Sequence, residues 1–270
     1  MPELPEVETV RRTLAPFVQG RTIATVAFAW PPTAVGGPST IAARLTGQRI
    51  ERLERFGKYL LFRLRRDGRG SLLIVHLRMT GNLVVNEASG AHTRARMSLD
   101  DGTEVVFHDI RKFGRWLWAE RLPARLAALG PDPLEIGPGE FAGRLRSRRA
   151  RLKALLLDQA FLRGLGNIYA DEALFRARLH PLRSAASVGP RKARDLHGAI
   201  QAVLREAIDA GGTSIRDYRD GRGERGAFQG QIRIYGRAAA PCISCGARVK
   251  RVLVAQRSTH FCPRCQRLHG

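Results

Sequence analysis

Residues 1–15, MPELPEVETVRRTLA, decide how the amino-terminal part of the chain folds. Apolar side chains recur there at the spacing of one helical face, at Val7, Val10 and Leu14. Pro5 stands in the first turn, where its missing N–H costs little, and three glutamates crowd the helix end that favours negative charge. We predict a helix over residues 5–15, ended by Pro16 and Gly20, that holds the amino terminus in place.

The same stretch places a secondary amine beside a carboxylate if Met1 is removed, which the small ring of Pro2 permits. An α-amino group has a reference pKa of about 7.7 to 8.0, so roughly a third of it is unprotonated at pH 7.5. When it condenses with an aldehyde-like carbon it gives an iminium, an electron sink, and Glu3 lies within reach for proton transfer. From these residues alone, Pro2 is either a nucleophile or simply the start of a helix.

Short strand-like runs follow, with no long helical pattern between them. They occupy residues 22–30, 49–55, 59–64, 72–77, 94–99, 104–108 and 115–119. Asp101-Gly102 is the clearest hairpin turn, and a short helix is expected near residues 40–45. The pattern predicts a β-sandwich or barrel behind the leading helix.

The composition changes after residue 120. Residues 121–140 are rich in proline and glycine and are typical of a linker. Helical patterns then occupy residues 149–159, 167–177 and 190–210, and residues 213–230 form a polar, glycine-rich stretch that we expect to be mobile. The fold class is therefore multidomain α+β.

All four cysteines lie in the last 29 residues, and their spacing is typical of a zinc site. Two Cys-x-x-Cys pairs, separated by sixteen residues, are Cys242, Cys245, Cys262 and Cys265. Four thiolates give a closed tetrahedral structural site for one Zn²⁺, with the pairs capping a hairpin over residues 249–261. Two disulfides or free thiols are the weaker alternative. Basic residues on the hairpin, among them Arg257, suit DNA phosphates.

The charge balance points to a polyanionic partner. Lys and Arg number 46 against 24 Asp and Glu, a formal charge of +22, which favours nucleic acid. A membrane surface is the competing polyanion, but no basic amphipathic helix with bulky apolar anchors is evident, and no apolar run reaches about 18 residues. Acidic residues at the start argue against a signal peptide. We expect an intracellular monomer that does not bind membranes.

Two segments, residues 76–81 (HLRMTG) and 109–114 (DIRKFG), each present a bulky apolar side chain flanked by cations and stopped by glycine. Met79 and Phe113 belong in the core by default. The alternative is a wedge inserted into a base stack, with Arg111 reaching the partner of an extruded base.

Two further positions are ambiguous. Asn167 follows a tight glycine turn, residues 162–166, and is a good helix N-cap; the amides behind it either bind a phosphate or only cap the helix. Lys58 follows Gly57 in a hairpin-like corner, where an exposed solubilising lysine is the default interpretation.

Together these segments resemble bacterial formamidopyrimidine-DNA glycosylases over essentially the whole chain, in the same order. The matching segments are residues 2–10 (PELPEVETV), Gly57-Lys58, 76–81, 109–114, 166–172 (GNIYADE) and the cysteine finger. The resemblance implies a bacterial, cytoplasmic, nucleoid-associated enzyme of DNA repair. It would remove oxidised purines, chiefly 8-oxoguanine and formamidopyrimidines, from duplex DNA, and cut the strand at the resulting abasic site.

The resemblance also implies roles for single residues. Pro2 would attack C1′ of the damaged nucleotide, Glu3 would donate a proton during base loss, Lys58 would assist β-elimination and Arg257 δ-elimination. Met79, Arg111 and Phe113 match the wedge. The remaining DNA-contacting positions are His76, His92, Arg149, Lys153 and Asn167.

The family fold consists of an amino-terminal helix plus β-sandwich, a helix-two-turn-helix module and a β-hairpin zinc finger. Here it implies a catalytic domain over residues 1–130, a helical domain over 131–230 that includes a lesion-recognition loop at 213–230, and a finger over 231–270. The sequence departs from the family at Ile110 and Lys112, where proline and arginine are more usual, and at Thr80. These departures affect how strictly the opposite base is read, not the chemistry.

Two alternatives stay open. The first is an endonuclease VIII-like glycosylase for oxidised pyrimidines; Leu4 and the wedge residues argue against it. The second is a zinc-finger DNA-binding protein without catalysis. The intact catalytic set argues against that, although the sequence does not show whether Met1 is removed; the set is Pro2, Glu3, Lys58 and Arg257.

Overall fold

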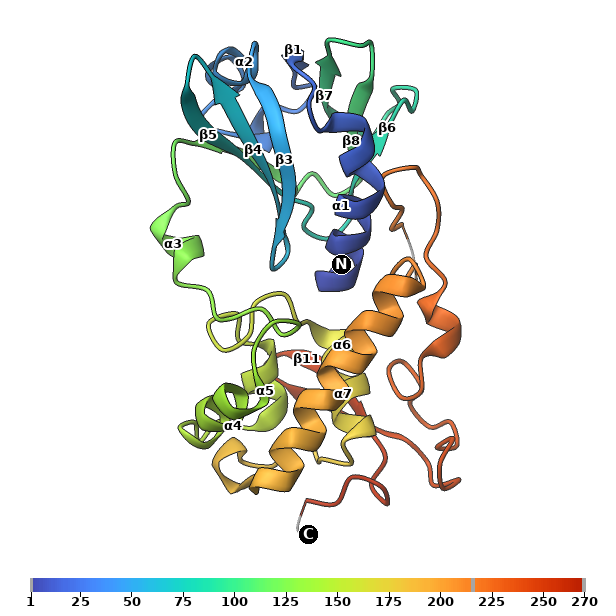
Figure 1. The fold of residues 1–270 in the computed structure, drawn as a ribbon. Helices are drawn as coiled ribbons and strands as arrows, with labels where there is room; N and C mark the ends of the chain where they lie inside the picture. The colour runs from blue at the N-terminus through green and yellow to red at the C-terminus, as the bar shows by residue number, and fades with distance from the viewer. Residues whose placement is uncertain (1, 215–216, 269–270) are drawn as a thin grey trace. The chain divides into compact units, whose positions relative to one another are not determined.

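A computed structural model describes residues 2–214 and 217–268. The chain forms two compact units, one of Met1–Ala127 with Ile208–Gln229 and the other of Ala128–Ala207 with Gly230–Gly270 (Figure 1). Removal of Met1 therefore lies outside the described residues, as do residues 215 and 216 of the expected mobile stretch. Among the described helices, none combines the length and apolarity needed to cross a bilayer.

The first unit begins with helix α1 (Leu4–Val18). Glu3 and Glu6 form a capping box, in which each side chain accepts from the other residue's backbone N–H. The helix does not end at Pro16, as the sequence suggested. It continues to Val18, because Gln19 N–H still donates to Ala15 O at 3.0 Å and Val18 is fully buried. A proline in the last turn removes only one backbone N–H donor, so the helix can continue past it.

Two sheets form the sandwich beside α1. The five-stranded sheet has the order β2 (Ala34–Val35), β9 (Arg115–Ala119), β5 (Arg69–His76), β4 (Tyr59–Arg66), β3 (Arg49–Phe56). The four-stranded sheet has the order β1 (Ile23–Ala27), β7 (Thr93–Leu99), β8 (Glu104–Asp109), β6 (Gly81–Val85). Neighbours are antiparallel except β2 and β9. One core, which includes Phe62, Phe107 and Trp116, joins these sheets to α1 and to helix α2 (Pro38–Leu45).

A strand is present in each of the seven expected ranges, the helix near residue 40 is present, and the predicted sandwich is confirmed. The turn at Asp101-Gly102 joins β7 to β8, with Gly102 at φ +83°. Strands β2 and β6 were not anticipated. β2 has only two residues, and β6 is buried along almost its whole length, so it lacks the alternation that marks a half-buried strand.

The second unit is mainly helical. Its helices are α4 (Pro138–Arg146), α5 (Leu152–Leu157), α6 (Asn167–Arg176) and most of α7 (Pro190–Asp209), with a 3₁₀ turn at Ala185–Ser187. The expected linker over residues 121–140 instead contains the short helix α3 (Ala124–Ala127) and the first turn of α4. Pro138 occupies the first turn of α4, so its proline and glycine signals mark a helix start.

The carboxy-terminal hairpin of this unit is β10 (Lys250–Val254) paired antiparallel with β11 (Arg257–Phe261). Ala255 and Gln256 join the strands with φ of +47° and +57°, the left-handed pair that a tight two-residue hairpin turn requires. This confirms the expected hairpin and leaves Arg257 exposed at its tip.

Candidate functional site

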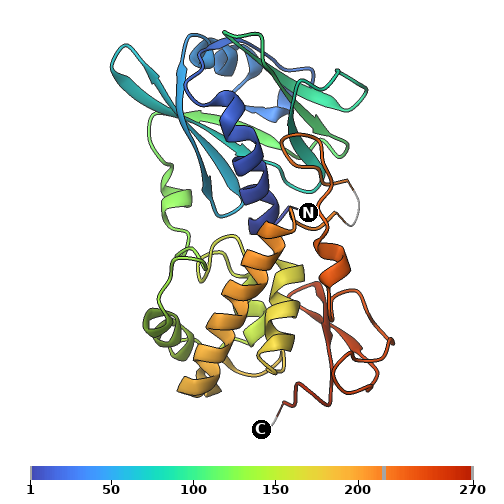
Figure 2. The same ribbon diagram turned by 45° about the vertical axis from the view of Figure 1, so that its right-hand side comes forward.

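The amino terminus is held by α1 and by the segment that returns from α7. Pro2 and Glu3 are buried. Glu6 Oε2 accepts from Glu3 N–H at 2.7 Å, while Glu6 Oε1 accepts from Thr213 N–H at 2.8 Å. Tyr218 Oη donates to Glu6 O at 3.2 Å. Figure 2 shows the start of α1 beside this segment, so one buried carboxylate fixes Glu3 relative to the expected lesion-recognition loop.

The described part of residues 213–230 is tied down at further points. Arg219 N–H donates to Asn82 Oδ1 and Gly221 N–H to Thr13 Oγ1, both at 2.8 Å. Gly226 passes so close to the carbonyl of Gly212 that a Cβ would overlap it. The glycines of this stretch therefore allow close backbone packing. Its expected mobility stays a prediction.

Lys58 lies in the turn between β3 and β4 and near His76, at the end of β5. Tyr59 packs edge-on against the His76 ring, 4.5 Å between centroids, and His76 Nδ1 accepts from Arg78 N–H at 2.9 Å. Burial, with the charges of Arg78 and Lys58, lowers the pKa of His76 to about 3. At neutral pH His76 is therefore an uncharged hydrogen-bonding group.

This pKa predicts a pH-dependent stability. In the unfolded chain a histidine titrates near 6.5, so below that pH the unfolded state binds a proton that folded His76 does not. The free energy of unfolding therefore falls as the pH drops from about 6.5 toward 3. Between pH 6.5 and 5.0 we expect His76→Gln to remove about 1–2 kcal/mol of this loss. Urea unfolding at both pH values measures it, and the same substitution at exposed His92 controls for the change of side chain. Equal pH dependence in parent and His76→Gln would contradict the assignment.

Met79, Arg111 and Phe113 form one exposed cluster. Met79 is 41% exposed and Phe113 44%, so the default expectation that they belong to the core is wrong. Arg111 Nη1 donates to Met79 Sδ at 3.0 Å, and its guanidinium lies over the Phe113 ring, 4.9 Å from the centroid. Large apolar side chains gathered with a cation on a surface mark an interaction site.

The backbone at this cluster is strained in the same way in both segments. Arg78, before Met79, has φ +57°, and Lys112, before Phe113, has φ +61°. Each left-handed residue costs about 1–2 kcal/mol. The strain is held by buried Asp109, which accepts from Thr80 Oγ1 at 2.5 Å and from Gly114 N–H at 2.7 Å. The fold therefore positions the two apolar side chains outward.

The four cysteines converge in the second unit. Their Sγ atoms all lie within 4.8 Å of one another, with Cys245 to Cys262 at 3.4 Å and Cys242 to Cys265 at 3.9 Å, and none of the four is in a disulfide. Four thiolates around one zinc at about 2.3 Å stand roughly 3.8 Å apart. The sulfur positions fit a tetrahedral Zn²⁺ site, and the hairpin β10–β11 lies between the two pairs.

Asn167 lies where α6 meets this hairpin. It is the first residue of α6, and the N-cap is Gly166, so the N-cap prediction was wrong. The Asn167 amide instead donates to Ser258 O at 2.9 Å, on the hairpin strand that begins with Arg257. The residue therefore connects the helix start to the finger.

Lys153 does not reach the surface, although the resemblance implies a DNA contact. Its side chain is fully buried, and its ammonium donates to Asn167 O at 2.8 Å and to Asp171 Oδ1 at 2.6 Å. The other Asp171 oxygen accepts from His260 N–H at 2.9 Å. Lys153 and Asp171 thus hold Asn167 and the hairpin together from inside. By contrast, His92, Arg149 and Arg257 are exposed, as a nucleic-acid contact requires.

Three buried carboxylates, Asp109, Asp171 and Glu172, were missed in the sequence analysis. Asp109 organises the wedge segments and Asp171 joins helix to hairpin, while Glu172 accepts from the backbone N–H groups of Ile234 and Tyr235 at 2.9 Å. The signal was present for the last pair: two consecutive acids on a helix whose neighbours are apolar are buried, and buried carboxylates need donors.

Comparison with known proteins agrees with this geometry. Residues 1–116 match the formamidopyrimidine-DNA glycosylase N-terminal domain, residues 129–219 the H2TH domain of the same enzymes, and residues 240–268 a zinc finger found in FPG and IleRS. The formamidopyrimidine-DNA glycosylase of Solibacter usitatus is 49% identical over 99% of this chain and 100% of its own. The chain belongs to the formamidopyrimidine-DNA glycosylase family.

Solved structures of the family agree with this fold. The MutM (Fpg) protein of Thermus thermophilus is 45% identical, with a TM-score of 0.87 over 98% of both chains. The Lactococcus lactis Fpg in complex with DNA containing N7-benzyl-Fapy-dG is 35% identical, with a TM-score of 0.89 over 98% of this chain and 100% of that one. The helix-plus-sandwich, helical module and cysteine hairpin are therefore those of the glycosylase family.

Proposed function

We propose that this chain is a bifunctional DNA glycosylase and abasic-site lyase that excises oxidised purines, 8-oxoguanine and formamidopyrimidines, from double-stranded DNA. The observation that carries the proposal is the exposed cluster of Met79, Arg111 and Phe113, built in the same unit that fixes Pro2 and Glu3. The cluster can insert into the base stack, and the same unit holds the nucleophile, Pro2. The Lactococcus lactis relative, solved with DNA containing a formamidopyrimidine, supports the substrate class.

The wedge makes the target carbon accessible. Extruding a nucleotide costs a few kcal/mol in lost stacking and pairing. Insertion of Met79 and Phe113 occupies the vacated space, and the Arg111 guanidinium offers donors to the acceptor groups of the orphaned cytosine. Neutralising phosphates with exposed arginines releases counterions, which favours the bound state further.

Base excision then needs a nucleophile and an acid. With Met1 removed, the neutral Pro2 nitrogen attacks C1′ and the bond from C1′ to the base breaks, so that the base leaves with the proton that the nitrogen gives up. Glu3 then supplies the proton that O4′ takes up when the bond from C1′ to O4′ breaks and the sugar ring opens. The product is an iminium between Pro2 and the opened sugar. Because Glu3 is buried and its backbone is held by Glu6, the acid stays beside the amine.

Strand cleavage follows from the iminium. Loss of a proton from C2′ expels the 3′ phosphate, assisted by Lys58, and a second elimination expels the 5′ phosphate, assisted by Arg257. Zinc supplies no chemistry to these steps, since a site with four cysteine ligands has no open position. The four thiolates bound to zinc instead fix the hairpin, and with it the position of Arg257 and the hydrogen bond from the Asn167 amide.

We assign base excision and β-elimination to a domain of residues 1–130, DNA and lesion binding to residues 131–230, and the zinc finger that carries Arg257 to residues 231–270. His76, His92, Arg149 and Asn167 contact DNA directly, and Lys153 acts by holding Asn167. Such an enzyme would work as a monomer on nucleoid DNA in the cytoplasm.

A substrate competition separates this proposal from the pyrimidine-specific alternative. Equimolar duplexes containing 8-oxoguanine opposite cytosine and thymine glycol opposite adenine, carrying different fluorophores, are incubated with limiting enzyme. We expect the 8-oxoguanine strand to be cut at least about 10-fold faster, because a wedge with Arg111 accepts cytosine as the orphaned base. Faster cutting of the thymine-glycol strand would favour the endonuclease VIII-like activity, and cutting of neither would favour a non-catalytic DNA-binding protein.

A further inference from the structure

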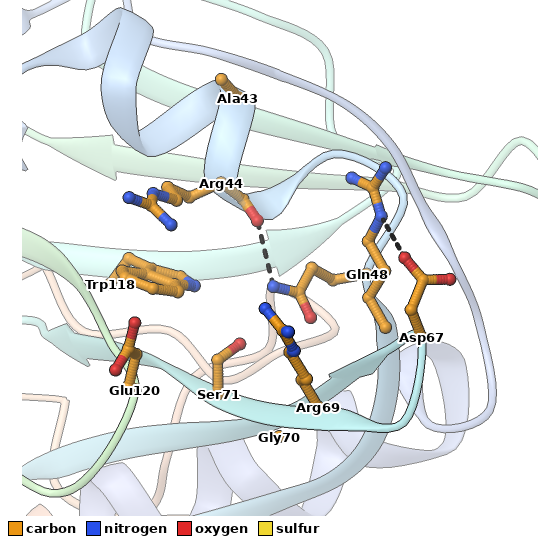
Figure 3. A pocket seen from close by; sticks show the side chains of 10 residues that line it. Ala43, Arg44, Gln48, Asp67, Arg69, Gly70, Ser71, Trp118 and Glu120 are labelled. Atoms are coloured by element: carbon orange, nitrogen blue, oxygen red, sulfur yellow. Dashed lines mark hydrogen bonds and ion pairs between the residues drawn. The ribbon is translucent and has the colours of Figure 1, made fainter.

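A cavity of about 970 Å³ opens in the first unit between the five-stranded sheet and α2 (Figure 3). Its walls come from α2, from the turn between β4 and β5, and from the end of β9. Ligand-binding pockets typically measure roughly 300–1,000 Å³. The cavity is therefore large enough for a mononucleotide-sized molecule.

The floor of this cavity carries polar atoms that the protein leaves unsatisfied. Ser71 lies on the same face of β5 as fully buried Leu73, which pairs with Trp118. Gln48 is 7% exposed and Ser71 8%. Within the described residues, Gln48 Oε1, Ser71 Oγ and Trp118 Nε1 have no hydrogen-bond partner.

Such atoms need an explanation, since each buried polar group left unpaired costs about 1–3 kcal/mol. The set is complementary in kind: Gln48 offers an acceptor, Trp118 a donor and Ser71 both. Gln48 is held in place because its amide donates to Arg44 O at 3.1 Å, the contact drawn in Figure 3. The atoms are therefore arranged for a partner with several hydrogen-bonding groups.

The rim of the cavity is positively charged. The Arg44 guanidinium stacks on the Trp118 ring, 4.7 Å from its centroid. The backbone of Arg69 pairs with Arg66 in the sheet, and within the described residues its guanidinium has no ion-pair or hydrogen-bond partner. Two acids line the cavity: Asp67 pairs with Arg66 at 3.5 Å, and Glu120 stands on the opposite side. In Figure 3 the Glu120 carboxylate and Arg69 both rise toward the centre. In the described part of the chain, the guanidinium groups of Arg44 and Arg69 are not paired with a carboxylate and therefore suit a phosphate. The Glu120 carboxylate suits a hydroxyl donor.

This cavity is remote from the catalytic end of the same unit. Lys58 precedes the first residue of β4, whereas the cavity lies at the turn after its last residue, Arg66. Eight extended residues span about 26 Å. The unsatisfied atoms and the arginines of the rim therefore play no part in the base-excision site.

We propose that this cavity is a binding site for a small phosphorylated organic molecule of mononucleotide size. The phosphate lies against Arg44 and Arg69, Glu120 accepts from a hydroxyl of the ligand, and polar groups of its organic part pair with the floor atoms of Gln48 and Ser71. Binding here is independent of the DNA-repair activity and does not rest on it.

Calorimetric titration of the full-length, zinc-loaded protein tests the proposal, with AMP, dGMP and glucose 6-phosphate as probes and inorganic phosphate alongside. We expect one-to-one binding of at least one organic probe. Exposed Arg69→Ala should weaken it about 10-fold or more, as for loss of a charge-assisted hydrogen bond. Arg52→Ala is the matched control, since Arg52 is 71% exposed and lies outside the cavity. Base excision should be unchanged by either substitution.

A second variant and an NMR signal distinguish a built site from diffuse attraction to a basic protein. Ser71→Ala should weaken the organic probe, and the Trp118 indole N–H resonance, assigned with Trp118→Phe, should shift on saturation. Absence of saturable binding by all three organic probes overturns the proposal. So does an equal loss in Arg52→Ala and Arg69→Ala, and so does inorganic phosphate binding as tightly as the best probe with no effect of Ser71→Ala, which would mean an adventitious ion only.

Discussion

Glu3→Gln should lower the single-turnover rate of 8-oxoguanine excision by about 10²- to 10⁴-fold, the usual contribution of a positioned acid. Binding of the same duplex should change by less than about 3-fold, because the substitution removes a titratable proton without altering size. The reason is geometric: Glu3 is buried next to Pro2 at the start of α1, whereas the neighbouring Glu6 carboxylate accepts from the backbone N–H groups of Glu3 and Thr213. Excision is followed on a gel under single-turnover conditions.

The substitution should leave folding nearly intact. Glu3 caps α1 by accepting the Glu6 N–H, and a glutamine oxygen can accept the same bond, so we expect only a few tenths of a kcal/mol of destabilisation. Glu54→Gln on β3 is the matched control for the charge change, since Glu54 pairs with Arg63 at the surface. Excision by Glu3→Gln at the parental rate would remove Glu3 from the proposed role.

Cys245→Ser should release the zinc and weaken binding to duplex DNA about 10-fold or more. Removing one of four thiolates opens the site, and the free energy of zinc binding, on the order of 10 kcal/mol, is what folds such a finger. The hairpin that carries Arg257 and accepts the Asn167 amide would then lose its anchor. Metal content by atomic absorption and affinity by fluorescence anisotropy measure the two effects.

The neighbouring Ser244→Ala controls for a change in the same turn, because Ser244 is exposed and is not one of the clustered ligands. It should keep one zinc and parental affinity. A zinc-free Cys245→Ser protein with parental affinity would show that the finger is dispensable for DNA binding.

The sequence predicted the sandwich, the main helices and the zinc hairpin because these depend on local patterns. Alternation, helical spacing and the two Cys-x-x-Cys pairs are each visible within short windows. One error arose where tertiary packing overrides a local signal. Val18 in the core carries α1 past Pro16. The linker error is instead a local signal misinterpreted, because a proline can also start a helix, as Pro138 does.

The site residues likewise divide into features that a local pattern reveals and features that depend on contacts between distant parts of the chain. The segments around Met79 and Phe113 could be found because apolar residues between cations and glycines are unusual, but their exposure follows from left-handed Arg78 and Lys112 and from the carboxylate of Asp109. None of these is a local preference. Likewise Asn167 is a good N-cap by residue type, yet its amide bonds to the hairpin, about 90 residues later, a contact that no window of sequence contains.

The most direct test of the central claim, that Pro2 is the nucleophile, is covalent trapping. The protein is first shown by intact mass to lack Met1, then incubated with an 8-oxoguanine:cytosine duplex and sodium borohydride, which reduces an iminium to a stable amine. We expect a single protein–DNA adduct, with the mass of the two joined through Pro2, and none from a form that retains Met1. An intact, zinc-loaded protein that lacks Met1 and cuts the duplex without forming this adduct would contradict the account.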